Sequence, residues 1–179
     1  MPVGIRDLHL LDLIDAQPRV AFDGAVWRVV REGRDPTAGR ASGGRWDPGV
    51  FDVLTTSLAR DGALSEIHYH LSLQPVFPSK VRFVAHELKV AATANLVIAD
   101  VAALGAYGVD AATYGARDYK RSQEIGDAAF FLGFDGLRAP SARGPFQNLV
   151  LFTERFAPEQ IEPARAEPLD WAALRKPKH

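Results

Sequence analysis

Hydrophobic residues recur at helical spacing in three segments of the chain. The first predicts a short helix over 7–16, and the third predicts a helix over 119–131 that Gly133 would end. The second follows Ser57, which is a suitable N-cap, and runs to about Leu73. Its buried side is expected to comprise Leu58, Ala63, Leu64, Ile67 and Leu71.

Short runs of β-branched, aromatic and alternating residues lie between these helices and predict strands. A glycine- and proline-rich stretch over 33–49 is typical of a loop. Residues 96–101 fit either a further strand or the approach to a small helix. The expected strands are Val26–Val30, Phe51–Thr56, Lys80–Val90, Gly136–Ala139 and Asn148–Thr153.

With 179 residues, 47% of them hydrophobic, the chain is long enough for one domain with a real core. The predicted elements indicate a single compact α+β domain over 1–179. Its chemistry-bearing motifs fall within 26–153. The proline-rich extension over 154–179 has one expected anchor, Trp171 with Leu174.

Composition excludes several functional classes. The formal net charge of −1 argues against a nucleic-acid-binding domain, and the lack of cysteine excludes disulfides and thiolate catalysis. Neither a signal peptide nor a membrane-length hydrophobic run is visible, so we expect a cytoplasmic protein without membrane contact. The chain also lacks the GxSxG nucleophile motif and a phosphate-binding loop ending in Gly-Lys-Ser/Thr.

Five arginines occur in or beside the glycine-rich segment. Guanidinium groups bind phosphate through paired hydrogen bonds, and glycine allows main-chain amides to approach the same oxygens. Most loop arginines are solvated, but we expect at least one of these to contact a ligand. Arg45 is the best candidate because two glycines precede it, and Arg28 follows because a charge within an apolar strand needs a partner. The five are Arg28, Arg31, Arg34, Arg40 and Arg45.

Glu66 is predicted to lie beside the hydrophobic stripe of the second helix. Such a carboxylate either has a structural partner, such as an arginine, or stabilises a developing positive charge, as in glycosyl transfer. The sequence leaves these two readings open. His68 and His70 follow at spacings of two, which is poor geometry for a metal site on a helix, so no metal is expected.

Taken together, these segments resemble the RES domain, a family named for an arginine, a glutamate and a serine. The resemblance covers Val26 to Thr153, in order and at plausible spacing. Its motifs are Trp27-Arg28, the GGRWDPG stretch over 43–49, VLTTS over 53–57, ALSE over 63–66, DGLRAPSA over 135–142 and NLVLF over 148–152.

The resemblance implies a fold like that of ADP-ribosyltransferases, with a mixed or antiparallel central sheet and flanking helices. It also implies a bacterial toxin that consumes NAD+ as its substrate by breaking the nicotinamide–ribose bond. The ADP-ribose would pass to a protein, to phosphate or to water. By the same resemblance, the catalytic residues are Glu66, Arg45 and Ser141, and the NAD+-binding residues are Arg28, Arg31, Arg45, Trp46, Thr55 and Asn148.

The resemblance further implies a cognate antitoxin of the Xre helix-turn-helix type that occludes the active site. The toxin would then form a hetero-oligomer with it, with no direct contact to nucleic acid. A protein that accepts ADP-ribose would be a second partner.

Two positions depart from the family pattern. Thr55 stands where many members have tyrosine, and Asp47 stands where asparagine is usual. A threonine cannot stack on nicotinamide, so the platform would come from Trp46, Tyr107 or Tyr114, or turnover of free NAD+ would be weak. The alternative is a non-catalytic module that binds a nucleotide or a protein and has lost turnover.

Overall fold

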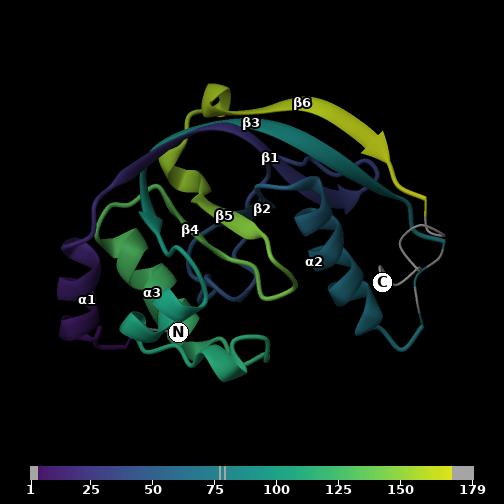
Figure 1. The fold of residues 1–179 in the computed structure, drawn as a ribbon. Coiled ribbons are helices and arrows are strands. Elements are labelled where there is room, and N and C mark those ends of the chain that lie inside the picture. Colours follow the sequence, from purple (N-terminus) through teal and green to yellow (C-terminus); the bar gives the residue numbers. More distant parts are fainter. Residues whose placement is uncertain (1–3, 77, 79, 171–179) are drawn as a thin grey trace.

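The computed structural model describes residues 4–76, 78 and 80–170. It is an α+β fold built on one six-stranded mixed sheet with the order β1-β2-β5-β4-β3-β6. The strands are β1 (Val20–Arg31), β2 (Val53–Ser57), β3 (Phe83–Val97), β4 (Gly136–Pro140), β5 (Gln147–Phe152) and β6 (Ile161–Pro168). Figure 1 shows β1, β3 and β6 arching over the shorter strands. The predicted fold class is confirmed.

Strand pairing runs in a circuit, because β1 pairs with both β2 and β3. The β1–β3 pairing is the longest and joins Val20–Arg31 to Phe83–Asn95, whereas β1 meets β2 only at Trp27 and Ser57. The end of β3 runs parallel to β4, and the other strand pairs are antiparallel. Within β2, Thr55 is exposed while its neighbours on the strand are buried.

Among the described residues, three α-helices flank the sheet: α1 (Leu8–Asp15), α2 (Arg60–Ser72) and α3 (Lys120–Phe131). In Figure 1, α1 and α3 lie together on one side and α2 lies on the other. The predicted end of α3 is confirmed. Gly133 has φ +84°, its N–H donates to Phe130 O, and Phe134 N–H donates to Ala129 O. This is the paired capping pattern that a left-handed glycine allows.

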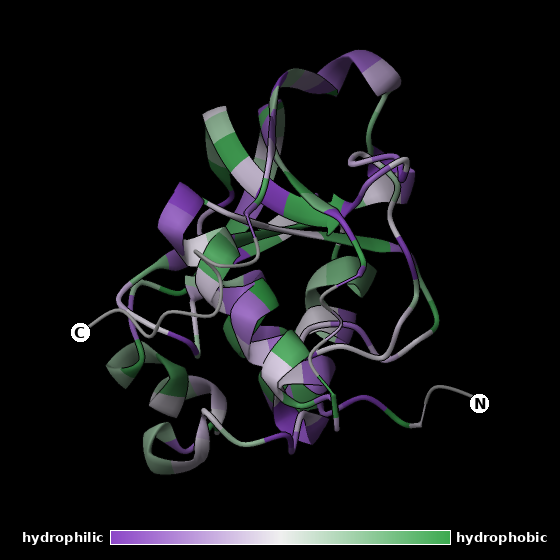
Figure 2. Cartoon of the chain, turned by 90° about the vertical axis from the view of Figure 1, so that its right-hand side faces the viewer, coloured by the Kyte–Doolittle hydropathy of each residue, from purple (hydrophilic) through white to green (hydrophobic). Residues whose placement is uncertain are grey.

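Two hydrophobic clusters hold these layers together. One lies between the sheet and the helices α1 and α3, and includes Trp46, Phe51, Ile125, Phe134 and Phe152. The other is enclosed by the strands and is built from Val26, Leu54, Leu88, Val90, Ala92, Leu149, Leu151 and Ile161. Neighbouring residues of β2 and β5 thus serve different clusters, as the alternation of side chains along a strand requires. Figure 2 shows hydrophobic and hydrophilic residues intermixed within single helices and strands.

Several sequence-based boundaries needed correction, and the strand expected over Lys80–Val90 runs from Phe83 to Val97. The first strand extends well beyond Val26–Val30 at its start, because β3 pairs with it over its whole length. Ser57 is the last residue of β2 rather than a helix N-cap; its Oγ accepts from Ala59 N–H, and α2 begins at Arg60. Residues 96–101 divide between the end of β3 and the approach to a 3-10 helix, Ala102–Tyr107.

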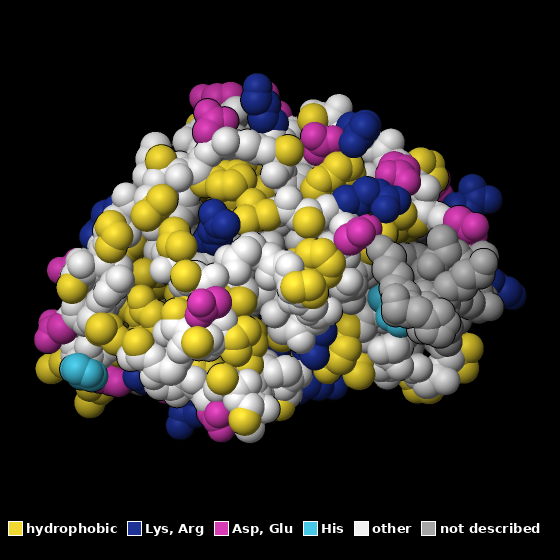
Figure 3. Space-filling view, in the orientation of Figure 1, with side chains coloured by type: hydrophobic (Ala, Val, Ile, Leu, Met, Phe, Trp, Pro, Cys, Tyr) yellow, Lys and Arg dark blue, Asp and Glu magenta, His cyan; other side chains and the backbone are white. Residues whose placement is uncertain are grey.

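The C-terminal extension contains a sheet strand, β6, after two short 3-10 helices, Thr153–Arg155 and Pro158–Gln160. β6 pairs along β3 and tolerates Pro163 and Pro168 because it is an edge strand. Charged side chains of both signs line this upper ridge in Figure 3. The expected anchor of Trp171 with Leu174 lies outside the described residues. In the described part of the chain, no helix has the length and hydropathy needed to cross a membrane.

Candidate functional site

Glu66, Ser141 and Asn148 meet at one point, although they come from three elements. Glu66 lies in α2, Ser141 directly follows β4, and Asn148 is in β5. Ser141 Oγ donates to Glu66 Oε1 at 2.7 Å, and Asn148 Nδ2 donates to the same oxygen at 3.1 Å. Among the described residues, no donor is recorded for Oε2. The carboxylate is therefore fixed through one oxygen, while the other is left for a further partner.

Ser141 and Asn148 are well placed to hold this carboxylate still. Both side chains are buried, whereas Glu66 is only partly buried. The hydroxyl of Ser141 also accepts the main-chain N–H of Arg143 at 3.0 Å, so its proton is directed at Glu66. Asn148 Oδ1 is buried without a hydrogen-bond partner, which is a costly state for a polar atom. That oxygen is an unpaired acceptor buried beside the carboxylate.

The position of α2 depends on a close approach at Gly62. A β-carbon at Gly62 would overlap Ser57 Oγ and touch the ring of Phe146. At the same end of α2, Arg60 makes a paired salt bridge to Glu167 of β6, with Nη2–Oε1 at 2.6 Å and Nε–Oε2 at 3.0 Å. Glycine thus lets the helix pack tightly where Glu66 needs to face β5.

Arg45 reaches the same region from the glycine-rich segment. Its Nη1 donates to Tyr114 O at 2.6 Å, and its Nη2 lies 3.5 Å from Ala116 O. The guanidinium carbon lies 4.5 Å from the Tyr114 ring centroid and 4.7 Å from that of Tyr119. Two aromatic faces and two carbonyls therefore fix the plane of a cation that is only partly exposed.

The turn that carries Arg45 is organised by Asp47. This carboxylate is fully buried and accepts three main-chain N–H groups, from Ser42 at 2.7 Å, Gly43 at 3.0 Å and Gly49 at 2.6 Å. A carboxylate suits three donors better than an amide, which has one acceptor oxygen. The departure from asparagine at this position thus has a structural explanation.

α3 packs directly on the same turn. Gln123 Nε2 donates to Gly44 O at 2.9 Å and to Gly43 O at 3.2 Å. A β-carbon at Gly126 would overlap the carbonyl oxygen of Trp46. Glycine is therefore required for α3 to lie against the turn, and the turn in this position places Arg45.

The structure does not bring all five arginines together. Arg28 Nη1 donates to Pro36 O at 3.0 Å and to Ala38 O at 2.9 Å, so it holds the loop rather than Glu66. Burial, followed by the nearby charge of Arg40, lowers the pKa of Arg28. The side chains of Arg31, Arg34 and Arg40 are exposed. Ligand binding by Arg28 and Arg31 stays a prediction.

Thr55 lies next to the Glu66 cluster. It pairs with Val150, while Ser57 pairs with Asn148, so Thr55 and Asn148 are on the same face of neighbouring strands. Thr55 is exposed even though β2 lies between β1 and β5 in the sheet. Its position fits the predicted role in binding, which stays a prediction.

The three aromatic residues expected as a nicotinamide platform are all buried: Trp46, Tyr107 and Tyr114. Trp46 packs in the cluster below the sheet, and Tyr114 OH donates to Pro140 O at 2.6 Å. Burial, the largest cause, raises the pKa of Tyr114 to about 12. Their positions indicate packing and positioning roles, and a contact of Trp46 with NAD+ stays a prediction.

The charges of Glu66 and of three arginines act together on His70. The exposed His70, one turn further along α2, lies within electrostatic range of Glu66 and of three arginines. Loss of hydration lowers the pKa of His70, Glu66 raises it, and the arginines lower it: Arg143, Arg117 and Arg45. A carboxylate with guanidinium groups in the same region suits a ligand that carries phosphate groups close to a reacting cationic centre.

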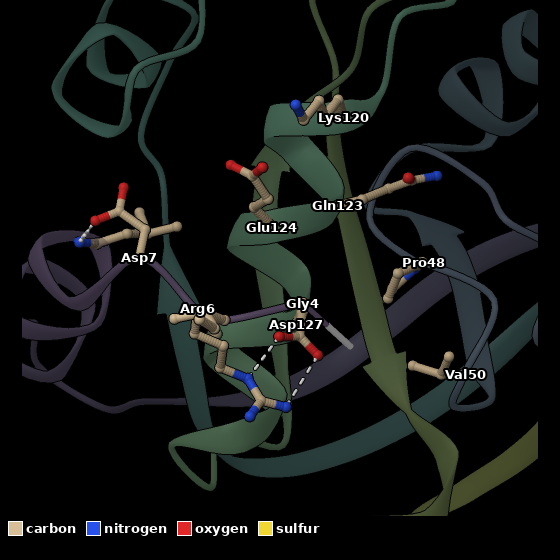
Figure 4. A pocket seen from close by; sticks show the side chains of 12 residues that line it. Gly4, Arg6, Asp7, Pro48, Val50, Lys120, Gln123, Glu124 and Asp127 are labelled. Atoms are coloured by element: carbon tan, nitrogen blue, oxygen red, sulfur yellow. Dashed lines mark hydrogen bonds and ion pairs between the residues drawn. The ribbon is translucent and has the colours of Figure 1, made fainter. Parts of the chain in front are cut away.

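A well-formed cavity lies elsewhere. It has a volume of about 360 Å³ and is lined by the N-terminal segment, the outer face of α3 and the turn at Pro48 and Val50 (Figure 4). The salt bridge between Arg6 and Asp127, 2.7 Å from Nε to Oδ2, crosses it. None of the residues predicted from the sequence as catalytic or NAD+-binding lines it. We therefore place the site by the convergence of polar groups rather than by this cavity.

Sequence reasoning missed Arg143, Tyr69 and Tyr119. Arg143 comes two residues after Ser141, just beyond the matched motif, and this adjacency was the available signal. Tyr69 and Tyr119 give no signal of their own, because their roles as faces for guanidinium groups depend on chain segments far apart in sequence.

Comparisons with known proteins agree with this picture. The chain is 24% identical over 163 residues to a protein named NAD(+) phosphorylase MbcT, found in both Mycobacterium tuberculosis and Mycobacterium bovis; the match covers 87% of this chain and 88% of that protein. A crystal structure of the M. tuberculosis MbcT–MbcA toxin–antitoxin complex has the same fold, with a TM-score of 0.82 and 23% identity over 94% of this chain and 96% of that one. The model of the RES domain matches residues 25–172. The chain belongs to the RES domain family.

Proposed function

We propose that this protein is a toxin that consumes NAD+ by breaking the bond between nicotinamide and ribose. The observation that carries the proposal is Glu66, fixed by Ser141 and Asn148, with the Arg143 guanidinium packed on Tyr69 of the same helix. The name NAD(+) phosphorylase, carried by relatives that align over most of their length, supports the same reaction.

Glu66 would act on the ribose carbon that loses nicotinamide. As the C–N bond breaks, its electron pair returns to the ring nitrogen, and nicotinamide leaves as a neutral molecule. The positive charge that develops at the ribose carbon would be stabilised by the carboxylate, whose orientation is fixed in advance. The oxygen Glu66 Oε2, unpaired among the described residues, would accept a ribose hydroxyl.

An acceptor oxygen completes the reaction by forming a new bond to the ribose carbon. Any proton on that oxygen passes to Glu66 or to solvent. We favour inorganic phosphate as the acceptor, because it is named in the activity of the relatives and because arginines converge on this site. The product would be ADP-ribose carrying a phosphate at that carbon; transfer to a protein is the competing outcome.

Such an enzyme would act in the cytoplasm, where NAD+ is abundant, and would need an inhibitor. The MbcT neighbour was crystallised with an antitoxin, which supports a cognate antitoxin for this chain. We propose that the antitoxin is of the Xre helix-turn-helix type, covers the Glu66 site and forms a hetero-oligomer with the toxin. Residues 1–179 would act as one functional domain.

The test is nicotinamide release from NAD+ by the purified protein, measured without acceptor, with inorganic phosphate and with cell lysate. We expect release that depends on phosphate, together with a phosphorylated ADP-ribose product, and none from Glu66→Gln. Release only with lysate, with ADP-ribose retained on a protein, would replace phosphate by a protein acceptor. Retained NAD+ binding without release under any condition would favour the non-catalytic module.

A further inference from the structure

Arg143 lies beside the Glu66 cluster and just outside the sequence motifs. Its main-chain N–H holds Ser141 Oγ, which in turn donates to Glu66. Its side chain makes a separate contact, with an aromatic ring of α2. The guanidinium carbon lies 3.3 Å from the ring centroid of Tyr69, which is three residues after Glu66 on α2. Main chain and side chain of Arg143 therefore tie the Ser141 loop to α2 in two different ways.

The guanidinium of Arg143 meets that of Arg45 at one loop. Arg143 Nη1 donates to Gly115 O at 3.0 Å, and Arg45 donates to the carbonyls on either side of it, at Tyr114 and Ala116. Three consecutive carbonyl oxygens thus face two arginines that come from segments about a hundred residues apart. These carbonyl oxygens carry partial negative charge and accept hydrogen bonds from the two guanidinium groups. A phosphate oxygen would offer the same donors a negatively charged acceptor.

Most of the hydrogen-bonding capacity of this pair is still open. Each guanidinium carries five N–H donors, and the described residues accept two from Arg45 and one from Arg143. Tyr114, Tyr119 and Tyr69 hold the guanidinium planes by stacking, which leaves the planar edges free for paired hydrogen bonds. Gly115 and Ala116 are exposed, so their carbonyls lie at the solvent side of the pair.

We propose that Arg143 and Arg45 form a phosphate-binding subsite beside Glu66, and that the Tyr114–Ala116 carbonyls occupy part of it when no ligand is bound. The proposal rests on the proposed function, because it supplies that reaction with an anion. The shared ligand chemistry is a phosphate group, either inorganic phosphate as the acceptor or the diphosphate of NAD+.

Substitution of the Arg143 side chain tests this subsite cleanly. Arg143→Ala and Arg143→Lys both keep the main-chain N–H that holds Ser141, so the Glu66 cluster is retained. Arg34→Ala is the matched control, since it removes an exposed arginine from the glycine-rich segment. Thermal unfolding of all three variants verifies the fold, and Arg143→Lys provides the milder change should the alanine variant be unstable.

Steady-state kinetics, with NAD+ and inorganic phosphate varied in turn, then shows which of the two ligands the subsite binds. A rise of about tenfold or more in KM for inorganic phosphate, with KM for NAD+ unchanged, assigns the subsite to the acceptor. The reverse pattern assigns it to the diphosphate of NAD+. Lysine should recover part of either loss, because it keeps the charge without the planar fork. Arg143→Ala with both KM values equal to those of Arg34→Ala overturns the proposal.

A binding measurement keeps the subsite separate from the reaction. Inorganic phosphate and ADP-ribose are titrated by calorimetry into the Glu66→Gln protein with and without Arg143→Ala. Weaker binding of either probe in the double variant supports the subsite even if the wild type releases no nicotinamide. Equal binding of both probes to the two proteins contradicts it, whatever the outcome for turnover.

Discussion

The Glu66 cluster and the cavity lined by α3 differ in how their charged groups are satisfied. At the cavity, Arg6 and Asp127 neutralise each other in a salt bridge. At the Glu66 cluster, neutral donors hold the carboxylate by one oxygen. Within the described part of the chain, the partners of the Arg45 and Arg143 guanidinium groups are neutral carbonyls and aromatic rings. A charge paired with its opposite stabilises the fold, whereas charges kept apart by neutral partners remain free to act on a ligand.

The largest effect on stability is expected from Gly126→Ala, which disturbs the contact between α3 and the turn that carries Arg45. The added methyl group would overlap Trp46 O, a main-chain atom that cannot turn aside. We expect a loss of about 1–3 kcal/mol or more in the free energy of unfolding, with nicotinamide release reduced as well. Urea denaturation and the release assay measure both; Gly105→Ala is the control, since a β-carbon there meets no neighbour.

The next largest effect is expected from removing the side chains that donate hydrogen bonds to Glu66. Ser141→Ala and Asn148→Ala each take away one hydrogen bond to Oε1, and the carboxylate gains freedom to rotate. We expect each to lower kcat by about 10–100-fold, with unfolding free energy changed by about 1–2 kcal/mol. If kcat stays within twofold of the wild type in both variants, holding Glu66 by one oxygen does not matter for turnover. The contrast drawn between the Glu66 cluster and the cavity would then be wrong.

Tyr114→Phe should have a smaller effect. It removes the hydrogen bond from Tyr114 OH to Pro140 O while keeping the ring that stacks on Arg45. The cost is expected to be about 1 kcal/mol in unfolding free energy and a few-fold in kcat/KM, since Pro140 directly precedes Ser141. A variant with unchanged thermal unfolding and unchanged kinetics would show that this contact does not position the loop.

The smallest effect on activity is expected at the cavity. Asp127→Asn breaks the salt bridge to Arg6, whose side chain is partly exposed, and should cost about 1 kcal/mol of stability after solvent screening. Nicotinamide release should remain unchanged. A loss of activity beyond the loss of folded protein would mean that the cavity takes part in catalysis.

The sequence predicted more of the local structure than of the long-range structure. Helix α3 was recognised to its last residue, because its hydrophobic pattern and the Gly133 cap are local signals. The early part of β1 and all of β6 were missed. Asp23, Gly24, Pro163 and Pro168 weaken those patterns, and both segments form strands by pairing with β3.

For the candidate site, too, the sequence predicted local features better than long-range contacts. The motifs identified Glu66, Ser141 and Asn148, but not that two of them hold the third through a single oxygen. The arginines that lie close together in the sequence are not the ones that lie close together in the structure. Arg45 stays near Glu66, Arg28 holds the loop, and Arg143 arrives from another segment. Those assignments depend on tertiary contacts that no local pattern encodes.

The most direct test of the central claim compares NAD+ binding and turnover in Glu66→Gln with the wild type. Glutamine keeps the shape of the side chain and an oxygen for Ser141 and Asn148, but it removes the negative charge. We predict that nicotinamide release falls at least about 100-fold while NAD+ affinity and thermal unfolding stay near wild-type values. Release within about twofold of the wild type would contradict the assignment of Glu66 as the residue that stabilises the ribosyl cation.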